Sequence, residues 1–449
     1  MKKLIDAVSI VITCGDEIFA IQRQRFLKAF PGYWAFPGGK VEKDDESFNH
    51  THELLKNHDL RLIGALAREG EEEIGINLKE LLDSGKIESI DLLGLAVTPD
   101  FNPHRFSTYF YRIHLKEKTP FKIDDNEAAV ARWMTCAELL ENYNKGEVLA
   151  VPPVIKVITE LGKNPALKSI PDLNFEFDSE NEVPFIESVK GIRQFMPRSH
   201  TLPPANRTNA FLIGDEGQRK ILLDPSPMDE AELERLIHTI TPFGVDAVML
   251  THHHGDHHEH ATSVAKHFKA PILISQDSMD RIKKKRPGYF DGVEVSILKQ
   301  DQVVTKWLGN DVIVHEIPGH DEGQLALAPK NLAWFIAGDL FQGVGTVVIG
   351  GEEGNMKKYF QTLEKVIAMA PKVLYPSHGI GLGGTVILEK TLDHRRVREN
   401  QILTMHDKGL TTQEMLETIY ADVSKELWPY ALENIRKHIE KLKEERKIE

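Results

Sequence analysis

A cluster of metal-ligating side chains, Thr251-His252-His253-His254-Gly255-Asp256-His257, constrains this chain more than any other feature. It follows the short apolar run 247–250, which is typical of a buried strand. His252, His254, Asp256 and His257 therefore form an H-x-H-x-D-H pattern in a strand-to-helix loop. Because imidazole and carboxylate are metal ligands, the pattern predicts a fold in which this loop is part of a metal site.

Three more candidate ligands lie downstream, each after an apolar run: His320, Asp339 and His378. Loops at strand ends are where α/β folds build their sites. The predicted ligand sets are His252, His254 and His320 for one metal, Asp256, His257 and His378 for the second, and Asp339 as the bridge. These ligands suit two Zn²⁺ ions, with Mn or Fe as alternatives. Both metals keep an open position for a shared water, which becomes hydroxide near neutral pH, so Asp256 and Asp339 are also predicted to be catalytic.

The sequence around this cluster alternates short apolar runs with helical stretches. The runs are 210–213, 221–223, 247–250, 272–274, 312–314, 332–336 and 373–375. Gly, Pro or polar residues bound each of them, which is an α/β pattern. We therefore predict a domain over 186–394, preceded by a linker over 166–185. A C-terminal domain over 395–449 is expected from a capping box at Thr411 to Glu414 and an apolar helical stripe, Leu432, Ile435, Ile439 and Leu442.

The ligand order resembles that of the metallo-β-lactamase superfamily, whose fold is an αββα sandwich. Neither cysteine lies in this part of the chain, which argues against the antibiotic-hydrolysing branch with a Cys ligand. The segments 203–210 and 222–224 resemble the lactamase-β-like protein 2 branch, and the run 396–403 resembles its C-terminal winged helix. That branch implies phosphodiester hydrolysis of a single-stranded RNA-like substrate. Thioester hydrolases of the glyoxalase II type share the ligands, and Asp321 stands where Thr is common.

The first block, 1–165, contains a second candidate site. Strands are expected at 7–13, 18–22, 92–97 and 106–114. Glu69, Glu72 and Glu73 stand at i, i+3 and i+4, so they project from one helical face, which Gly75 ends. Three clustered carboxylates repel one another unless a hard cation such as Mg²⁺ or Mn²⁺ lies among them. We predict Glu69 and Glu73 to be catalytic as well as metal-ligating.

Together with the upstream turn Gly38-Gly39, this helix resembles the Nudix box, whose domain is an α/β/α sandwich. Gly39, Arg68 and Arg105 are the substrate-binding residues that the resemblance suggests. The box is interrupted by an insertion between Glu46 and Leu62, which we expect to be a surface excursion outside the metal site. An interrupted box, with the segments 98–110 and 150–153, resembles the peroxisomal-type coenzyme A diphosphatases. The implied reaction is pyrophosphate cleavage in a nucleoside-diphosphate-X substrate, such as a small nucleotide or a coenzyme A derivative.

The bulk composition favours a multidomain protein without membrane segments. The chain has 449 residues, a net charge of −13 and only two cysteines. No 20-residue apolar span is present, and Met1-Lys2-Lys3 reads as the start of a strand rather than of a signal peptide, so a cytoplasmic protein is expected. The acidic surface disfavours bulk nucleic-acid binding, although 281–286 is a local basic run.

Three functions remain open from the sequence. The first is a bifunctional metallohydrolase whose second domain cleaves a phosphodiester. In the second, that domain is an acyl-thioester hydrolase. The third is a nucleotide- or RNA-binding module in which one metal site has decayed. The sequence gives no oligomeric state.

Overall fold

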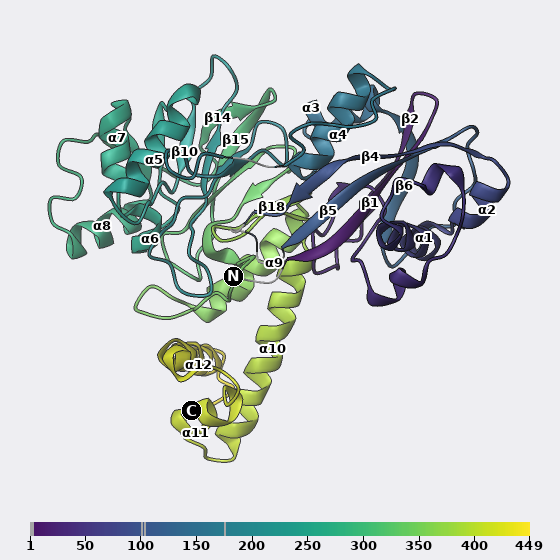
Figure 1. Ribbon diagram of the computed structural model, residues 1–449. Helices are drawn as coiled ribbons and strands as arrows, with labels where there is room; N and C mark the ends of the chain where they lie inside the picture. The colour runs from purple at the N-terminus through teal and green to yellow at the C-terminus, as the bar shows by residue number, and fades with distance from the viewer. Residues whose placement is uncertain (1–3, 100–101, 103–104, 175–176) are drawn as a thin grey trace. The chain divides into compact units, whose positions relative to one another are not determined.

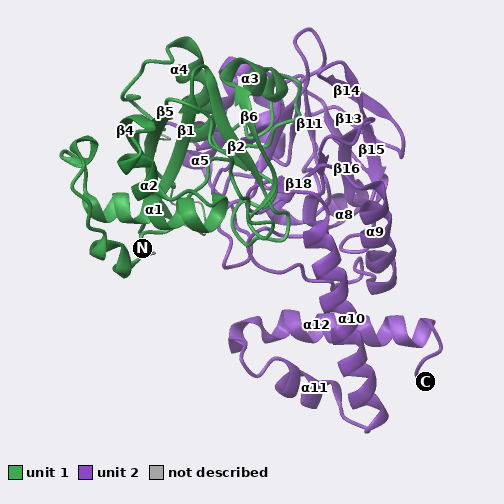
Figure 2. Cartoon of the chain, turned by 90° about the vertical axis from the view of Figure 1, so that its right-hand side faces the viewer, with its two compact units in different colours: residues 1–177, 186–190 green, residues 178–185, 191–449 purple. Residues whose placement is uncertain are grey.

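The computed structural model describes residues 4–99, 102, 105–174 and 177–449 (Figure 1). Pro103 and His104, which belong to the coenzyme A diphosphatase resemblance, lie outside the described residues, as do Met1-Lys2-Lys3. The chain forms two compact units: unit 1 is Met1–Phe177 with Ile186–Lys190, and unit 2 is Asp178–Phe185 with Gly191–Glu449 (Figure 2). No helix in the described part of the chain is long and apolar enough to cross a bilayer.

Unit 1 is a sheet with helices on both faces. Its elements are β1 (Ile5–Cys14), β2 (Glu17–Arg23), β3 (Trp34–Ala35), η1 (Lys43–Ser47), η2 (Glu53–Leu55), α1 (Leu60–Ile74), α2 (Leu78–Asp83), β4 (Ile87–Val97), β5 (Phe106–Leu115), β6 (Ala128–Thr135), α3 (Cys136–Asn144) and α4 (Pro152–Lys163). The strand order is β3-β2-β1-β5-β4, with β6 also paired to β2. Strands β1 and β5 run parallel, from Ile5 opposite Phe106 to Cys14 opposite Leu115.

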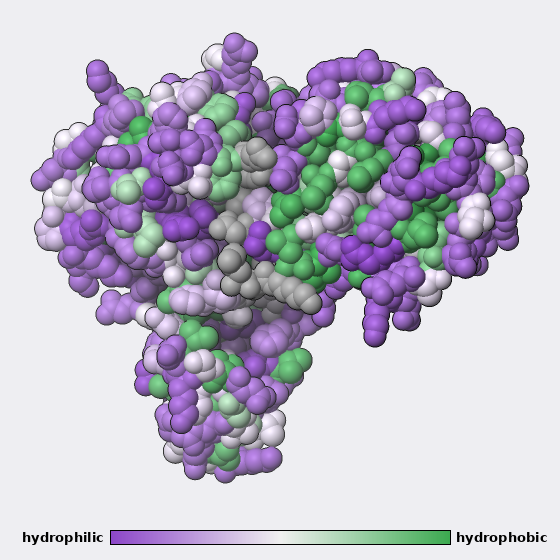
Figure 3. All heavy atoms as spheres, in the orientation of Figure 1, coloured by the Kyte–Doolittle hydropathy of each residue, from purple (hydrophilic) through white to green (hydrophobic). Residues whose placement is uncertain are grey.

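Alternation along β1 gives unit 1 its two cores. Val8, Ile10 and Ile12 pack in the core that contains residues of α1, whereas Val11 packs in the core that contains residues of α4. Successive strand residues point to opposite faces, so one apolar strand supplies both layers. Figure 3 shows hydrophobic side chains gathered over β4 and β5, where Leu92 and Leu95 are 38% and 40% exposed. The helix layer therefore leaves part of the edge strand β4 open.

The predicted insertion in the Nudix-like box is not merely a surface excursion. Leu55 of η2 is only 3% exposed and belongs to the core beside α1, and Phe48 and Leu54 pack against it. The prediction underestimated this segment because its few apolar residues show no helical or strand periodicity. The predicted linker differs too, because Ile170 and Leu173 are buried in unit 1.

Unit 2 contains two sheets. Its elements to residue 383 are β7 (Phe185–Ile186), β8 (Arg193–Phe195), β9 (Ala210–Ile213), β10 (Ile221–Leu223), α5 (Glu230–Ile240), η3 (Thr241–Phe243), β11 (Ala247–Met249), α6 (Gly255–His258), α7 (Ala261–Phe268), β12 (Ile272–Ile274), α8 (Gln276–Lys285), β13 (Val295–Ile297), β14 (Val303–Trp307), β15 (Asn310–Glu316), β16 (Leu325–Pro329), β17 (Phe335–Ile336), η4 (Gly338–Leu340), α9 (Met356–Met369), β18 (Val373–Tyr375) and β19 (Leu382–Gly383). The sheet orders are β13-β12-β11-β10-β9-β8-β7 and β14-β15-β16-β17-β18-β19. One core joins the first sheet to α5, α7 and α8, and another joins the second sheet to α9 and α10. This αββα arrangement confirms the fold class expected from the sequence.

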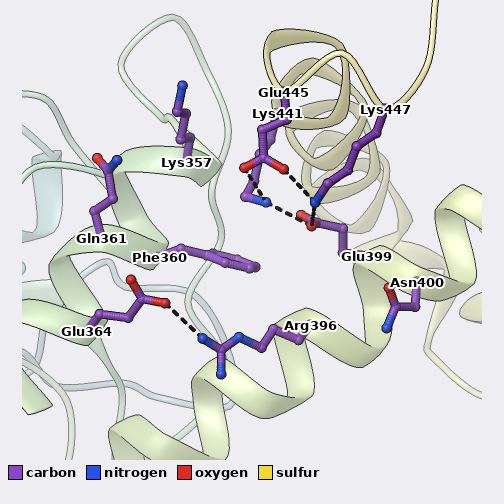
Figure 4. Close-up of a pocket in the computed structure, with 10 residues that line it drawn as sticks. All are labelled: Lys357, Phe360, Gln361, Glu364, Arg396, Glu399, Asn400, Lys441, Glu445 and Lys447. Atoms are coloured by element: carbon purple, nitrogen blue, oxygen red, sulfur yellow. Dashed lines mark hydrogen bonds and ion pairs between the residues drawn. The ribbon is translucent and has the colours of Figure 1, made fainter.

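The C-terminal part of unit 2 is helical: α10 (Val386–Asp407), α11 (Thr412–Ile419), η5 (Lys425–Leu427) and α12 (Trp428–Glu444). The capping box at Thr411 and Glu414 is present, and Ile435 and Leu442 are buried as the stripe predicted. A cavity of about 480 Å³ lies where α9, α10 and α12 meet (Figure 4). Within it Lys441 Nζ lies 2.8 Å from Glu399 Oε1, an almost fully buried ion pair that fastens α12 to α10.

Candidate functional site

The predicted ligands of unit 2 lie on loops that follow strands. His252 and His254 follow β11, and the short helix α6 positions Asp256 and His257. The other three follow β15, β17 and β18, and are His320, Asp339 and His378. Five of these seven residues are buried, and the other two, His254 and Asp256, lie at the start of α6.

The first predicted ligand set converges. The ligand atoms of His252, His254 and His320 all lie within 4.8 Å of one another. His254 Nδ1 and His320 Nε2 are 3.0 Å apart. His252 Nε2 is buried without a hydrogen-bond partner, which is costly unless a metal ion accepts its lone pair. Burial lowers the pKa of His320 to about 4, so its ring is neutral, the form that ligates metals.

The second predicted set converges as well. The ligand atoms of Asp256, His257 and His378 lie within 4.8 Å of one another. Asp256 Oδ2 is 3.8 Å from His257 Nε2 and 3.6 Å from His378 Nε2. His257 Nε2 is buried without a hydrogen-bond partner, as His252 Nε2 is.

Asp339 faces both sets, with one carboxylate oxygen toward each. Its Oδ1 is 3.6 Å from His257 Nε2 and 3.5 Å from His378 Nε2, whereas its Oδ2 is 3.7 Å from His320 Nε2. Burial alone would raise the pKa of this carboxyl, but the charges of His378 and His257 hold it well below its ordinary value. Ligands bound tetrahedrally about 2.1 Å from one Zn²⁺ are roughly 3.4 Å apart. The donor atoms therefore fit two metal ions that share Asp339.

Hydrogen bonds engage the second ring nitrogen of four of the histidines predicted as ligands. Asp224 Oδ2 lies 2.9 Å from His257 Nδ1 and accepts from Thr251 Oγ1, which lies 3.0 Å from His252 Nδ1. The carbonyls of Val348 and Arg207 lie 2.9 and 2.8 Å from the Nδ1 atoms of His320 and His378, respectively. Such outer contacts set which ring nitrogen faces a metal.

Two acidic residues complete this shell, and the prediction missed them. Glu353 Oε1 lies 3.3 Å from His254 Nε2, and hydrogen bonding to His254 lowers the pKa of Glu353 to about 2. Asp224 is buried at the end of β10. The position of Asp224 just after an apolar run could have revealed it, but Glu353 lies in a Gly-rich loop without any such signal. His253, which stands between two predicted ligands in the sequence, is buried and pairs with Asp321.

The Nudix-like site of unit 1 centres on Arg68. Its guanidinium donates to both carboxylate oxygens of Asp45, at 2.9 and 3.1 Å, and to Glu69 and Glu72 at 2.8 and 3.1 Å. Asp45 lies six residues after Gly39 and was not among the predicted site residues. Arg68 therefore holds the turn and the helix together.

Two glycines bring the turn close to the carboxylates. The backbone N–H of Gly38 donates to Glu73 Oε2 at 2.9 Å. A Cβ on Gly39 would lie 2.3 Å from Glu69 Oε1, so a side chain there would displace this carboxylate. Burial raises the pKa of Glu73 to about 7 and raises that of Glu69 as well. Cations would relieve this burial penalty by restoring the charged carboxylates.

The predicted ligand atoms of unit 1 do not all lie close enough together to bind one metal ion. Among the described residues, sets of three ligand atoms within 4.8 Å occur around the histidine site only, and Glu69, Glu72 and Glu73 do not form one. Glu72 is 60% exposed, while Arg68 contacts Glu69 and Glu72. Arg105 donates to the carbonyl of Thr98, so it supports its own loop.

Comparison with protein families decides the identity of these parts. Residues 3–151 match the NUDIX domain, residues 203–378 match the metallo-beta-lactamase superfamily, and residues 411–449 match the beta-lactamase associated winged helix domain. The chain joins a NUDIX domain to a metallo-beta-lactamase domain with its winged helix. It is a hydrolase, and both resemblances drawn from the sequence are confirmed at this level.

Individual relatives match parts of the chain. The beta-lactamase-like protein 2 homolog of Drosophila melanogaster is 26% identical over 251 residues, which are 54% of this chain and 84% of that protein. The hydroxyacylglutathione hydrolase of Bdellovibrio bacteriovorus is 26% identical over 171 residues, 37% of this chain and 61% of that protein. A NUDIX hydrolase structure from Alicyclobacillus acidocaldarius has a TM-score of 0.32 and 23% identity, and covers 37% of this chain and 94% of that chain.

Proposed function

We propose that the metallo-beta-lactamase domain is a hydrolase with two divalent metal ions, Zn²⁺ or else Mn or Fe, held by the seven ligands. The observation that supports this most strongly is the carboxylate of Asp339, whose two oxygens face the two ligand sets. Two such ions would acidify a shared water and polarise the bond that it attacks.

The residues of the chain would hold and orient these groups rather than attack the substrate. No Ser or Cys belongs to the ligand set, and the two cysteines, Cys14 and Cys136, lie in unit 1. Asp256 contributes a carboxylate to the second set, which neutralises part of the charge there. The hydrogen bonds to Asp224, Val348 and Arg207 keep the imidazoles in their ligating orientation.

For this domain we propose a phosphodiester substrate similar to single-stranded RNA. Support comes from the match to the beta-lactamase-like protein 2 homolog, which covers more of this chain than the other relatives named above. An acyl thioester is the second candidate, because a hydroxyacylglutathione hydrolase also matches. The third reading, a binding module with a decayed site, is disfavoured because each predicted ligand of this domain belongs to a group of side chains that could hold a metal ion.

For the NUDIX domain we propose cleavage of a pyrophosphate in a nucleoside-diphosphate-X substrate, a small nucleotide or a coenzyme A derivative, with Mg²⁺ or Mn²⁺. Buried Glu69 and Glu73 beside the glycine turn support it. Glu69, Glu72 and Glu73 would hold the cation, and Arg68 would then exchange some of its present contacts. Gly39 and Arg105 remain proposals for substrate contact.

A substrate screen with each domain separately disabled tests both assignments. Glu73→Gln should abolish pyrophosphate hydrolysis only, and His252→Ala should abolish the second activity only, because the two ligand sets share no residue. The panel is coenzyme A, ADP-ribose, a single-stranded oligoribonucleotide and an acyl-glutathione thioester. Hydrolysis of the thioester but not of the oligoribonucleotide would favour the second candidate. Loss of both activities in either variant would overturn the assignment of separate sites.

A further inference from the structure

Three cations of the basic run 281–286, Arg281, Lys285 and Arg286, contact residues around the proposed metal site. The run forms the last turn of α8 and the residue after it. Lys285 Nζ is 3.2 Å from His253 Nε2, and Arg286 Nη1 donates to the carbonyl of Glu259, so both touch the loop and helix that hold the ligands. Arg281 Nη1 is 3.7 Å from Glu353 Oε2, and Glu353 in turn contacts His254.

Four consecutive cations of this run lack an acidic partner. Among the described residues, no carboxylate lies within 4.0 Å of the charged groups of Lys283, Lys284, Lys285 or Arg286, whereas Arg281 pairs with Asp277. A second group of cations in unit 2, around the cavity of Figure 4, is different, because Lys441 and Lys447 lie 2.9 and 2.7 Å from Glu445. In a chain with a net charge of −13, this concentration of unpaired positive charge favours an anion.

The contact with His253 holds one of these cations in place. A lysine ammonium can only donate, so Nε2 of His253 accepts from Lys285, while Nδ1 of His253 faces Asp321. His253 and Asp321 are both buried. The Lys285 ammonium is therefore anchored beside the ligand loop and keeps two further N–H donors, for which the described residues provide no acceptor.

We propose that Lys283, Lys284, Lys285 and Arg286 form an anion-binding subsite for a phosphate group of the substrate that flanks the bond being cleaved. Phosphate oxyanions match this set, because lysine ammonium groups and an arginine guanidinium bind them by charge-assisted hydrogen bonds. The proposal rests on the proposed phosphodiesterase function, and it adds that the substrate carries at least one phosphate besides the scissile one. A nucleoside polyphosphate and a polynucleotide both provide this chemistry.

The test uses the full-length protein with Lys283→Gln/Lys284→Gln, two exposed positions without contact to the ligand loop. Lys299→Gln/Lys306→Gln is the matched control, since it removes two equally exposed charges elsewhere in unit 2. For an oligoribonucleotide we expect KM to rise at least tenfold in the first variant only, with kcat within twofold. Bis(4-nitrophenyl) phosphate has no second phosphate, so its kcat/KM should stay unchanged. Equal KM values for both variants on the oligoribonucleotide would overturn the subsite.

Direct binding separates this proposal from the proposed function. If no phosphodiester is hydrolysed, the proposed function fails, and binding of a labelled oligoribonucleotide then decides the subsite alone. The slope of log K against log salt should fall by about 1.4 in Lys283→Gln/Lys284→Gln, at about 0.7 for each phosphate contact. An unchanged slope would overturn the subsite. Inorganic triphosphate, but not adenosine, should compete with the labelled oligoribonucleotide if the subsite recognises phosphate. If ADP competes as effectively as an unlabelled oligoribonucleotide, the phosphate that the subsite binds belongs to a nucleotide rather than to a polynucleotide.

Discussion

Replacing Asp224 with Asn tests whether outer hydrogen bonds hold the metal ligands of unit 2. The carboxylate follows β10 and accepts from Thr251 N at 2.7 Å and from Thr251 Oγ1 at 2.6 Å, and its Oδ2 is 2.9 Å from His257 Nδ1. The side-chain amide of Asn has one oxygen and one NH₂ group. In the variant this NH₂ group would face Thr251 or His257 donors that meet a carboxylate oxygen in the unmodified protein. Residue 224 has a φ of 46°, and Asn tolerates this left-handed region better than most residues. The substitution therefore changes the hydrogen bonds and leaves the backbone in place.

The expected loss follows from the partners of Asp224. Removing an outer partner of a metal-ligating histidine typically costs 10- to 100-fold in metal affinity, or about 1.4–2.7 kcal/mol. Donors left unpaired in a buried site should also cost the apoprotein about 1–3 kcal/mol of stability. Chelator-buffered Zn²⁺ titration measures the first quantity, and urea unfolding of the metal-free protein measures the second.

Asp246→Asn is the matched control for this variant. Asp246 precedes β11 and accepts from Lys220 N, just before β10, at 2.7 Å, so it joins the same two strands at their other ends. The described contacts of Asp246 include no predicted metal ligand. The Zn²⁺ affinity of Asp246→Asn should therefore equal that of the unmodified protein. If Asp224→Asn binds Zn²⁺ as tightly as this control, the outer hydrogen bonds do not position the ligands and the reasoning is refuted.

Three further predictions concern the other sites. Glu73→Gln should reduce pyrophosphate hydrolysis at least about 100-fold in steady-state assays, and near-normal turnover would remove Glu73 from the metal site. Gly39→Ala should also impair pyrophosphate hydrolysis, because its Cβ would lie 2.3 Å from Glu69 Oε1. The control Gly70→Ala should be tolerated, because the nearest atom to its Cβ would be 3.6 Å away. Equal turnover of the two variants would contradict the importance of the close approach at Gly39. Glu399→Gln should destabilise the C-terminal helices by about 1–3 kcal/mol in thermal unfolding, since it removes the buried carboxylate that faces Lys441 and leaves this lysine with Glu445 as its acidic partner. Burial opposes ionisation of Glu399, but hydrogen bonds from His438 and Lys441 hold its pKa below the usual value. The stabilisation by Glu399 should therefore be present above about pH 4.3 and lost on further acidification. If Glu399→Gln unfolds at the same temperature as the unmodified protein at pH 7, Glu399 does not have this role.

The candidate metal-binding groups of unit 2 could be predicted because metal chemistry restricts ligands to few residue types, which here stand at strand ends. The apolar runs 210–213, 221–223, 272–274 and 373–375 match β9, β10, β12 and β18 residue for residue. Such short, fully buried strands leave little choice of boundary. The run 332–336 is shorter in the structure, since β17 begins only at Phe335.

Features that depend on contacts between distant parts of the chain could not be predicted from the sequence. Glu353 reaches His254 from 99 positions away, and no local pattern marks it. Leu55 lies in an aperiodic insertion, yet it joins the core because that segment folds back onto α1. His253 stands between the predicted ligands His252 and His254 in the sequence, but its side chain is buried and pairs with Asp321.

The metal content of the Asp339→Ala variant tests the central claim most directly. The unmodified full-length protein, purified without chelator, should contain about two equivalents of Zn²⁺, Mn or Fe by elemental analysis, as a two-metal site requires. Asp339→Ala should lose at least one equivalent together with activity on the oligoribonucleotide and the thioester, while coenzyme A and ADP-ribose hydrolysis stays unchanged. Full metal content and full activity on either substrate in Asp339→Ala would contradict the account.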